Sequence, residues 1–254
     1  MESAELRPST PRRPGLTQVG LAGAILAVAA AAWLLTADRM AGMDAGPGTD
    51  LGAAGWFAVS WLVMMAAMML PSLAPAALAS ARAGGGRTVA VFVAGYLAAW
   101  TAAGLVAYLA FEAVRRLDAA FLAWDRAGRY VAAGVILAAA VYQVTAAKGA
   151  CLDRCRTPLE ERPAAAGGLR GGLRHGRNCI GCCAGLMAAL FALGVMSLTW
   201  MAAVAALIAA ERLLPWRTPA VYAVAGTLAV LAIWVAVAPG DLPGLTVPGS
   251  MGGM

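Results

Sequence analysis

The chain is built from long apolar runs, each close to the roughly 20 residues that an α-helix needs to cross the hydrocarbon core of a membrane. Of its 254 residues, 61% are hydrophobic and 13% are charged, and the charged residues are gathered between the runs. Such a chain has too little polar surface to be a soluble globule. The sequence therefore predicts an all-α fold, a polytopic transmembrane helical bundle with about six spans.

The predicted spans cover residues 16–36, 53–79, 88–111, 129–147, 179–210 and 218–238. The second and fifth exceed a simple span, so a tilted helix, an extension beyond the bilayer or a re-entrant piece near the cysteines are all compatible with them. We expect a transmembrane domain over 16–238, with an N-terminal tail over 1–15 and a C-terminal tail over 239–254.

The lysine and arginine distribution predicts the orientation of this bundle. With six spans, twelve basic residues lie on the side of the two tails and of the long loop between spans four and five, and seven lie on the other side. The positive-inside rule then puts both termini and that loop in the cytoplasm, in a bacterial inner membrane. The formal charge of +6 is explained by these topology-setting arginines, so no nucleic-acid partner is expected.

Cysteines flank the predicted cytoplasmic loop, and they form two clusters: Cys151 with Cys155, and Cys179 with Cys182 and Cys183. The first pair is spaced by four residues and shares a face if the fourth span continues as a helix for another turn. Cys179, Cys183 and Met187 share a helical face in the same way. The loop between the clusters is rich in glycine and arginine, so it can fold back and bring the sulfurs to one site.

Three interpretations of the cysteines stay open at this stage. A structural disulfide is disfavoured by a reducing cytoplasmic side. Buried thiols can act as small hydrophobic side chains, which accounts for one or two of them. Metal ligation or thiol redox chemistry accounts for all of them, although their spacing does not identify a metal.

A second group of sulfur atoms lies inside the second predicted span. Met64 with Met68, and Met65 with Met69, form two pairs spaced by four residues, and Pro71 can kink the helix beside them. Methionine is also an ordinary filler of apolar helices. If these thioethers bind a metal, they favour Cu(I) or Ag(I) over Zn(II) and release no proton.

Further methionines suggest a sulfur-lined route from the outer loop to the inner cysteines; they are Met40, Met43, Met196, Met201, Met251 and Met254. His175, the one histidine of the chain, lies four residues before Cys179 and is a candidate ligand in the loop. Tyr142 and Gln143 are candidates for hydrogen bonds around the sulfur site.

Two carboxylates stand at predicted outer span ends, where Glu112 and Glu211 are expected to pair with Arg115 and Arg212 as interfacial anchors. A proton-driven transporter is poorly supported by a chain with so few intramembrane acids. The sequence also shows no nucleophile with its base, no paired carboxylates and no phosphate-binding glycine motif, so ordinary hydrolytic or transferase catalysis is not expected.

At these motifs the chain resembles a bacterial family of uncharacterised proteins described as predicted metal-binding integral membrane proteins. The resemblance covers about residues 55–215 and rests on the Met64–Pro71 stretch, Tyr142-Gln143, Lys148, the Cys151/Cys155 pair with Arg156, His175-Gly176, the 179–183 cysteine motif and Met187. It implies metal binding and names no substrate.

Together these features predict a membrane protein that binds a soft metal ion, Cu(I) in preference to Zn(II), for handling, transfer or delivery. A metallochaperone or metalloenzyme is the expected protein partner, and the lipid bilayer surrounds the bundle. Two alternatives stay open: a membrane thiol-disulfide oxidoreductase, and a helical scaffold subunit whose sulfurs only pack.

Overall fold

A computed structural model describes residues 16–41, 50–116, 124–156, 167–242 and 245. Within these ranges the regular structure is helical: α1 (Leu16–Met40), α2 (Ala54–Arg116), a π-helical turn (Trp124–Gly128), α3 (Arg129–Gln143), α4 (Ala146–Arg156), α5 (Gly168–Leu193), α6 (Leu198–Leu213), α7 (Arg217–Val237) and a 3₁₀ turn (Pro239–Asp241). The predicted all-α helical bundle is confirmed.

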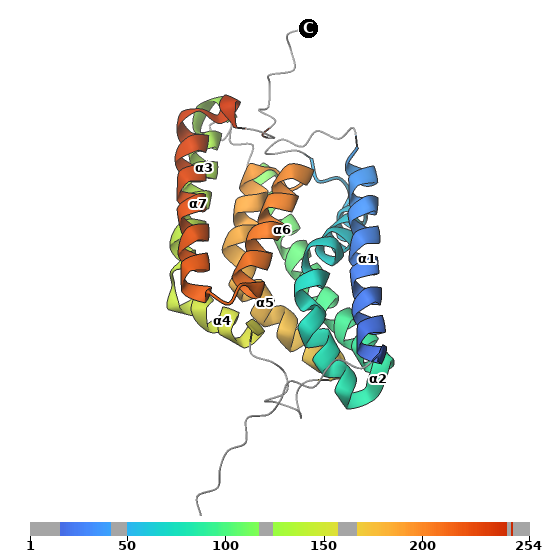
Figure 1. The fold of residues 1–254 in the computed structure, drawn as a ribbon. Coiled ribbons are helices and arrows are strands. Elements are labelled where there is room, and N and C mark those ends of the chain that lie inside the picture. Colours follow the sequence, from blue (N-terminus) through green and yellow to red (C-terminus); the bar gives the residue numbers. More distant parts are fainter. Residues whose placement is uncertain (1–15, 42–49, 117–123, 157–166, 243–244, 246–254) are drawn as a thin grey trace, which may run out of the picture.

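Two glycines divide α2 into two helices that run in opposite directions (Figure 1). Gly84 leaves the helical region, and Gly85 takes a φ of +70°, a left-handed conformation that glycine adopts without strain. The two helices, Ala54–Ala81 and Gly84–Arg116, are each long and apolar enough to cross a membrane. They correspond to the second and third predicted spans.

Among the described residues, five helices are long and apolar enough to be spans, and a sixth is added if α3 and α4 are counted as one broken span. The axes of α3 and α4 differ by 65° across the break at Val144 and Thr145. The chain therefore does continue as a helix through Cys151 and Cys155, as predicted, but in a new direction. Figure 1 shows α4 across one end of the bundle.

The fifth predicted span, 179–210, is wrong as a single element. The structure has two helices there, α5 and α6, which run in opposite directions and are joined by a turn at residues 194–197 (Figure 1). Gly194 has a φ of +112°, and no charged residue lies in the turn to mark it in the sequence. The helix α5 also begins at Gly168, inside the stretch that was predicted to be a flexible loop.

This additional reversal of the chain changes the side of the bundle on which the last helix ends. The start of α1 and the end of α7 lie at opposite ends (Figure 1), whereas the sequence prediction placed both termini on one side. The residues of the two tails themselves, 1–15 and 246–254, lie outside the described residues.

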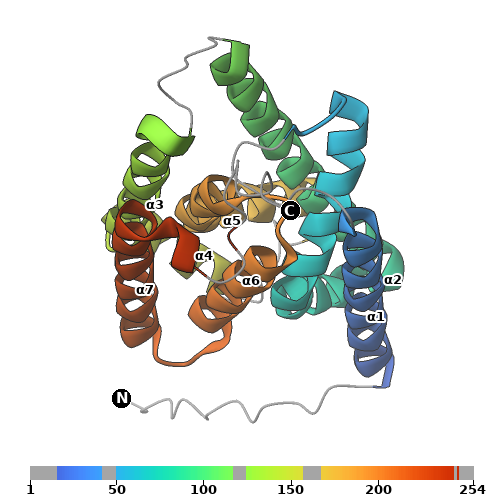
Figure 2. The same ribbon diagram turned by 90° about the horizontal axis from the view of Figure 1, so that it is seen from above.

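Helices α5 and α6 occupy the middle of the bundle, with α1 and α2 on one side and α3 and α7 on the other (Figure 2). Close packing between α5 and the second half of α2 depends on small residues. A Cβ on Gly172 would collide with the Phe92 carbonyl, and a Cβ on Gly176 would lie 2.7 Å from the Cβ of Ala99. These glycines let the two helices approach to backbone contact, as small residues do in membrane bundles.

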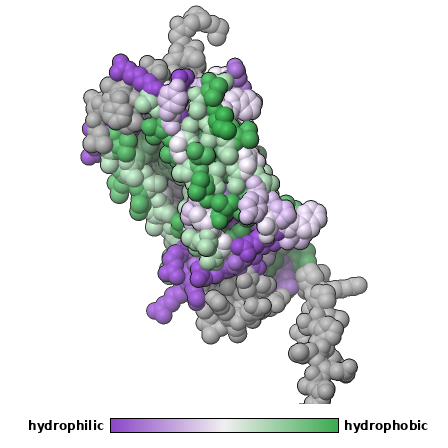
Figure 3. All heavy atoms as spheres, turned by 90° about the vertical axis from the view of Figure 1, so that its left-hand side faces the viewer, coloured by the Kyte–Doolittle hydropathy of each residue, from purple (hydrophilic) through white to green (hydrophobic). Residues whose placement is uncertain are grey.

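The outer faces of the flanking helices are apolar. On the side formed by α3 and α7, Figure 3 shows hydrophobic atoms over most of the height and a hydrophilic band at the α4 end. Large side chains such as Leu137, Val230 and Ile233 are at least half exposed on these helices. An exposed apolar belt of this kind is compatible with a surrounding bilayer.

Candidate metal centre

Three cysteines of one helix gather in the interior of the bundle. The Sγ atoms of Cys179, Cys182 and Cys183 all lie within 4.8 Å of one another, and the three residues are 0–2% exposed. Their spacing of three and four residues places them on one face of α5, toward the middle of a 26-residue helix. The cysteines are therefore buried inside the bundle, next to its α4 end.

A fourth sulfur reaches this cluster from α4. The Sγ of Cys155 lies 3.8 Å from the Sγ of Cys182, which in turn lies 3.7 Å from the Sγ of Cys183. Two thiolates bound to one ion at about 2.3 Å would be roughly 3.8–4.0 Å apart. The spacing of the sulfurs therefore suits a shared ion, and the cysteines of the chain are all free.

Cys151 has a different environment from Cys155. Its Sγ would lie 2.7 Å from a Cβ added to Gly181, so it packs directly against the backbone of α5. Tyr142 holds the same segment, because its hydroxyl donates a 2.8 Å hydrogen bond to the Gly181 carbonyl. Tyr142 thus positions the cysteine segment through the backbone of Gly181.

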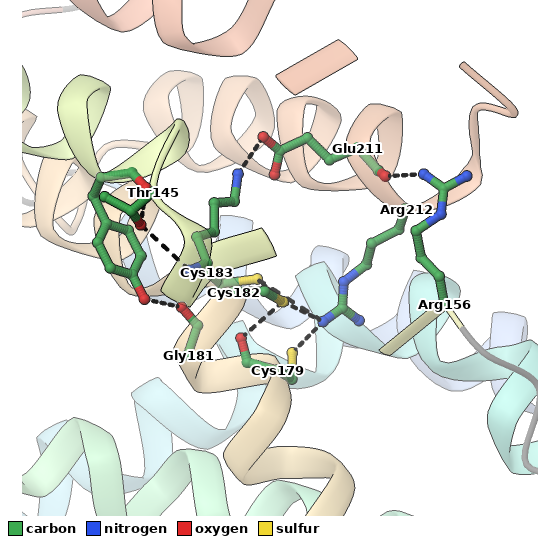
Figure 4. A network of polar contacts seen from close by, with 10 residues as sticks. Thr145, Arg156, Cys179, Gly181, Cys182, Cys183, Glu211 and Arg212 are labelled. Atoms are coloured by element: carbon green, nitrogen blue, oxygen red, sulfur yellow. Dashed lines mark hydrogen bonds and ion pairs between the residues drawn. The ribbon is translucent and has the colours of Figure 1, made fainter. Parts of the chain in front are cut away.

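Arg212 at the end of α6 points into the sulfur cluster (Figure 4). Its Nη2 lies 2.7 Å from the Sγ of Cys179, 3.2 Å from that of Cys182 and 4.0 Å from that of Cys183. Its Nη1 donates to the Ser72 hydroxyl at 3.3 Å. The hydroxyl of Tyr96 also contacts the Cys179 Sγ, at 2.9 Å.

The expected pairing of Glu211 with Arg212 is wrong. Glu211 is 2% exposed and forms a buried ion pair with Lys148 of α4, while Arg212 turns to the sulfurs (Figure 4). Arg156 binds the carbonyl oxygens of Glu211 and Leu214, at 2.5 and 2.6 Å. The other expected pair, Glu112 with Arg115, is present at 3.5 Å.

Two basic residues of α4, Lys148 and Arg156, thus fasten that helix to the end of α6. This fastening matters for the site, because α4 carries Cys155. The sequence offered one signal for this contact, because Lys148 is an ionisable residue in an apolar chain and such residues mark functional positions. It gave no means to identify Glu211 as the partner of Lys148, which lies 63 residues away.

The remaining predicted ligands lie around the cluster. His175 and Met187 are on α5, one turn before Cys179 and one turn after Cys183, and both are buried. His175 is not a loop residue: it lies within α5, and its ring centroid is 5.9 Å from those of both Phe92 and Tyr96. It lies outside the group of mutually close ligand atoms, which among the described residues contains the three cysteines of α5.

The four methionines of the second predicted span are all buried in the first half of α2, with exposures of 0–4%. They are Met64, Met65, Met68 and Met69. They lie near the middle of Ala54–Ala81, as the cysteines lie near the middle of α5, and α2 packs against α5. Met196 and Met201 are also buried, near the start of α6. Met43, Met251 and Met254 lie outside the described residues.

Comparison with known proteins adds an independent line of support. The model of the PpoB2 family, which is described as a copper chaperone, matches residues 58–235. The chain belongs to this copper chaperone family. No curated protein and no solved structure matches it. Membership of the family and the buried cysteine cluster together support a role in copper handling.

Proposed function

We propose that this copper chaperone family member is an integral membrane protein that binds one Cu(I) ion between Cys179, Cys182 and Cys183 and passes it to a partner. The observation that carries the proposal is the convergence of the three buried Sγ atoms within 4.8 Å. Thiolate sulfur is a soft donor that suits Cu(I), and burial away from water protects the ion from oxidation and hydrolysis. The copper chaperone family supports copper as the cargo.

In this proposal the metal ion enters and leaves the site through Cys155. It is partly exposed at the α4 end of the bundle, and its Sγ is 3.8 Å from the buried Cys182. A metal ion that arrives at Cys155 can therefore move to the α5 cysteines by exchanging one sulfur ligand at a time. The partner would be a soluble metallochaperone or a metalloenzyme that offers thiol ligands of its own.

The distribution of charge supports a cytoplasmic α4 end. Nine basic residues whose side chains are described lie in the half of the bundle next to α4: Arg87, Lys148, Arg154, Arg156, Arg170, Arg174, Arg177, Arg212 and Arg217. Five lie in the other half: Arg39, Arg115, Arg116, Arg126 and Arg129. The positive-inside rule then places α4, the start of α1 and Cys155 in or next to the cytoplasm of a bacterial inner membrane, and the end of α7 on the outer side.

We further propose that the four methionines of α2, together with Met187, form a thioether wall beside the cysteine site. Their burial at a similar depth in an adjacent helix supports this arrangement. Thioethers bind Cu(I) without proton release, so they suit a transient step of transfer. His175 is the least supported of the predicted ligands, because its ring packs against Phe92 and Tyr96 and lies outside the group of mutually close ligand atoms.

The test is metal analysis of the purified protein in detergent, expressed with copper, zinc and iron all available. We expect one equivalent of copper in the parent and none in a variant with Cys179, Cys182 and Cys183 changed to Ser. Cys151→Ser is the matched control, since this cysteine packs against Gly181, and it should retain copper. Replacement of the four α2 methionines by Leu should keep the equivalent of copper but slow its release to a competing chelator.

Two outcomes would overturn the proposal. Equal trace metal in the parent and the triple variant would leave thiol redox chemistry or packing as the role of the sulfurs. A Cys155–Cys182 disulfide that forms reversibly in membranes, in a parent without copper, would favour the thiol oxidoreductase.

A further inference from the structure

Arg212 places a fixed positive charge on the sulfur cluster. The same guanidinium nitrogen, Nη2, is within 3.2 Å of the sulfurs of Cys179 and Cys182, and the other, Nη1, is held by Ser72 on α2 (Figure 4). An arginine side chain stays protonated in proteins, so this charge does not depend on pH in any ordinary range. The site therefore has a cation built into it before any metal arrives.

The carboxylate next to Arg212 in the sequence does not neutralise this charge. Glu211 is bound by Lys148, and its backbone carbonyl accepts from Arg156. The groups that face the Arg212 guanidinium are thus the cysteine sulfurs, the Ser72 hydroxyl and, beside Cys179, the Tyr96 hydroxyl. The cysteine sulfurs are thus the closest contacts of the Arg212 guanidinium.

We infer that Arg212 makes this site select for the charge of the metal ion, and favours monovalent over divalent soft cations. The inference rests on the proposed function, because it concerns the same sulfur ligands. Cu(I) and Zn(II) have the same number of d electrons and both accept thiolate ligands, so they differ at such a site chiefly by one unit of charge. A guanidinium beside the ion repels the divalent ion twice as strongly as the monovalent one.

The size of this effect follows from the geometry. An ion about 2.3 Å from each sulfur would be roughly 5 Å from a guanidinium that touches the same sulfurs. At an effective dielectric constant of about 20, one additional unit charge on the ion at that separation lowers its association constant by a factor on the order of a hundred. Arg212 would in this way reject zinc without any change in the identity of the ligands.

The experiment measures the ratio of the Cu(I) and Zn(II) association constants by chelator competition in detergent, and repeats it with Ag(I) and Cd(II), a second pair that differs by one charge. In Arg212→Gln the ratio should fall on the order of a hundredfold toward the divalent ion. Arg212→Lys keeps the charge and should retain most of the preference. Arg115→Gln removes an arginine that pairs with Asp50 and Glu112 and should leave the ratio within about twofold.

A second route removes the net charge without removing the arginine. Ser72→Asp places a carboxylate against the Arg212 Nη1, and Ser72→Asn is its neutral, nearly isosteric control. We expect Ser72→Asp to shift the ratio in the same direction as Arg212→Gln and Ser72→Asn to leave it unchanged. This pair decides the question if Arg212→Gln does not fold.

A parent that binds no stoichiometric Cu(I) would refute the proposed function itself. A parent that binds Cu(I), with the same Cu(I) to Zn(II) ratio in Arg212→Gln or Ser72→Asp, would leave that function standing and overturn the selectivity assigned to Arg212. A residue that only packs would change both affinities together and would not move their ratio.

Discussion

The buried pair of Lys148 and Glu211 should show different pH responses when its two members are removed one at a time. Both side chains are 1–3% exposed, so a partner left alone keeps little contact with water. An isolated buried charge is relieved by neutralisation, and the free energy of that neutralisation sets an upper limit on the loss of stability.

Lys148→Met leaves Glu211 to take up a proton. For a carboxyl of reference pKa ~4.3, this costs about 3.7 kcal/mol at pH 7 and about 1.6 kcal/mol at pH 5.5. Glu211→Gln leaves the Lys148 ammonium buried without its carboxylate partner, and an uncompensated buried charge costs about 3–5 kcal/mol. The deficit of the first variant therefore shrinks as pH falls, and that of the second does not.

The assay is the free energy of unfolding in mixed micelles, titrated with a denaturing detergent at both pH values. The double variant Lys148→Met with Glu211→Leu leaves no buried charge and should lie within about 1 kcal/mol of the parent. Losses below about 1 kcal/mol in both single variants, or parallel pH trends, would refute the reasoning, since they would mean that water reaches the pair.

Three further predictions concern single side chains. Cys155→Ser should slow copper transfer to a soluble thiol acceptor at least tenfold, while the protein keeps its equivalent of copper. The control variant Cys151→Ser should transfer copper at the rate of the parent. Equal transfer rates for both variants would show that copper does not pass through Cys155. Gly172→Ala should lower the stability of the bundle by about 1–3 kcal/mol, because its Cβ meets the Phe92 carbonyl, and a detergent unfolding titration measures this. Tyr96→Phe should weaken Cu(I) binding by about five- to tenfold in chelator competition, since one hydrogen bond to the Cys179 sulfur is lost; an unchanged affinity would show that this hydroxyl does not contribute.

Much of the helical content could be predicted from the sequence, because spans in a bilayer need runs of about 20 apolar residues. The runs 16–36, 53–79, 88–111 and 218–238 correspond to helices of the structure. The hidden turn between α5 and α6 could not be found in this way. It depends on a left-handed φ at Gly194 inside a stretch that is apolar throughout, and hydropathy does not report a change of direction.

The candidate site was predictable in its chemistry but not in its geometry. Cysteines spaced by three and four residues share a face of any helix, so Cys179, Cys182 and Cys183 were expected together. The burial of these residues was not, because the start of α5 at Gly168 turns a presumed loop into about two turns of helix before His175. The sequence indicated a flexible loop before the cysteines, and the longer helix buries them beside α4.

The sequence by itself determined that the chain is a bundle of apolar helices and that its candidate metal ligands are sulfur atoms. The apolar composition requires the helices to be shielded from water, and sulfur ligands prefer soft metal ions. Only the tertiary structure decided which charges meet. Glu211 and Arg212 are neighbours in the chain, yet successive residues of a helix point in directions about 100° apart, so one side chain reaches Lys148 and the other reaches the cysteines. Contacts between distant helices are fixed by packing, which local sequence does not encode.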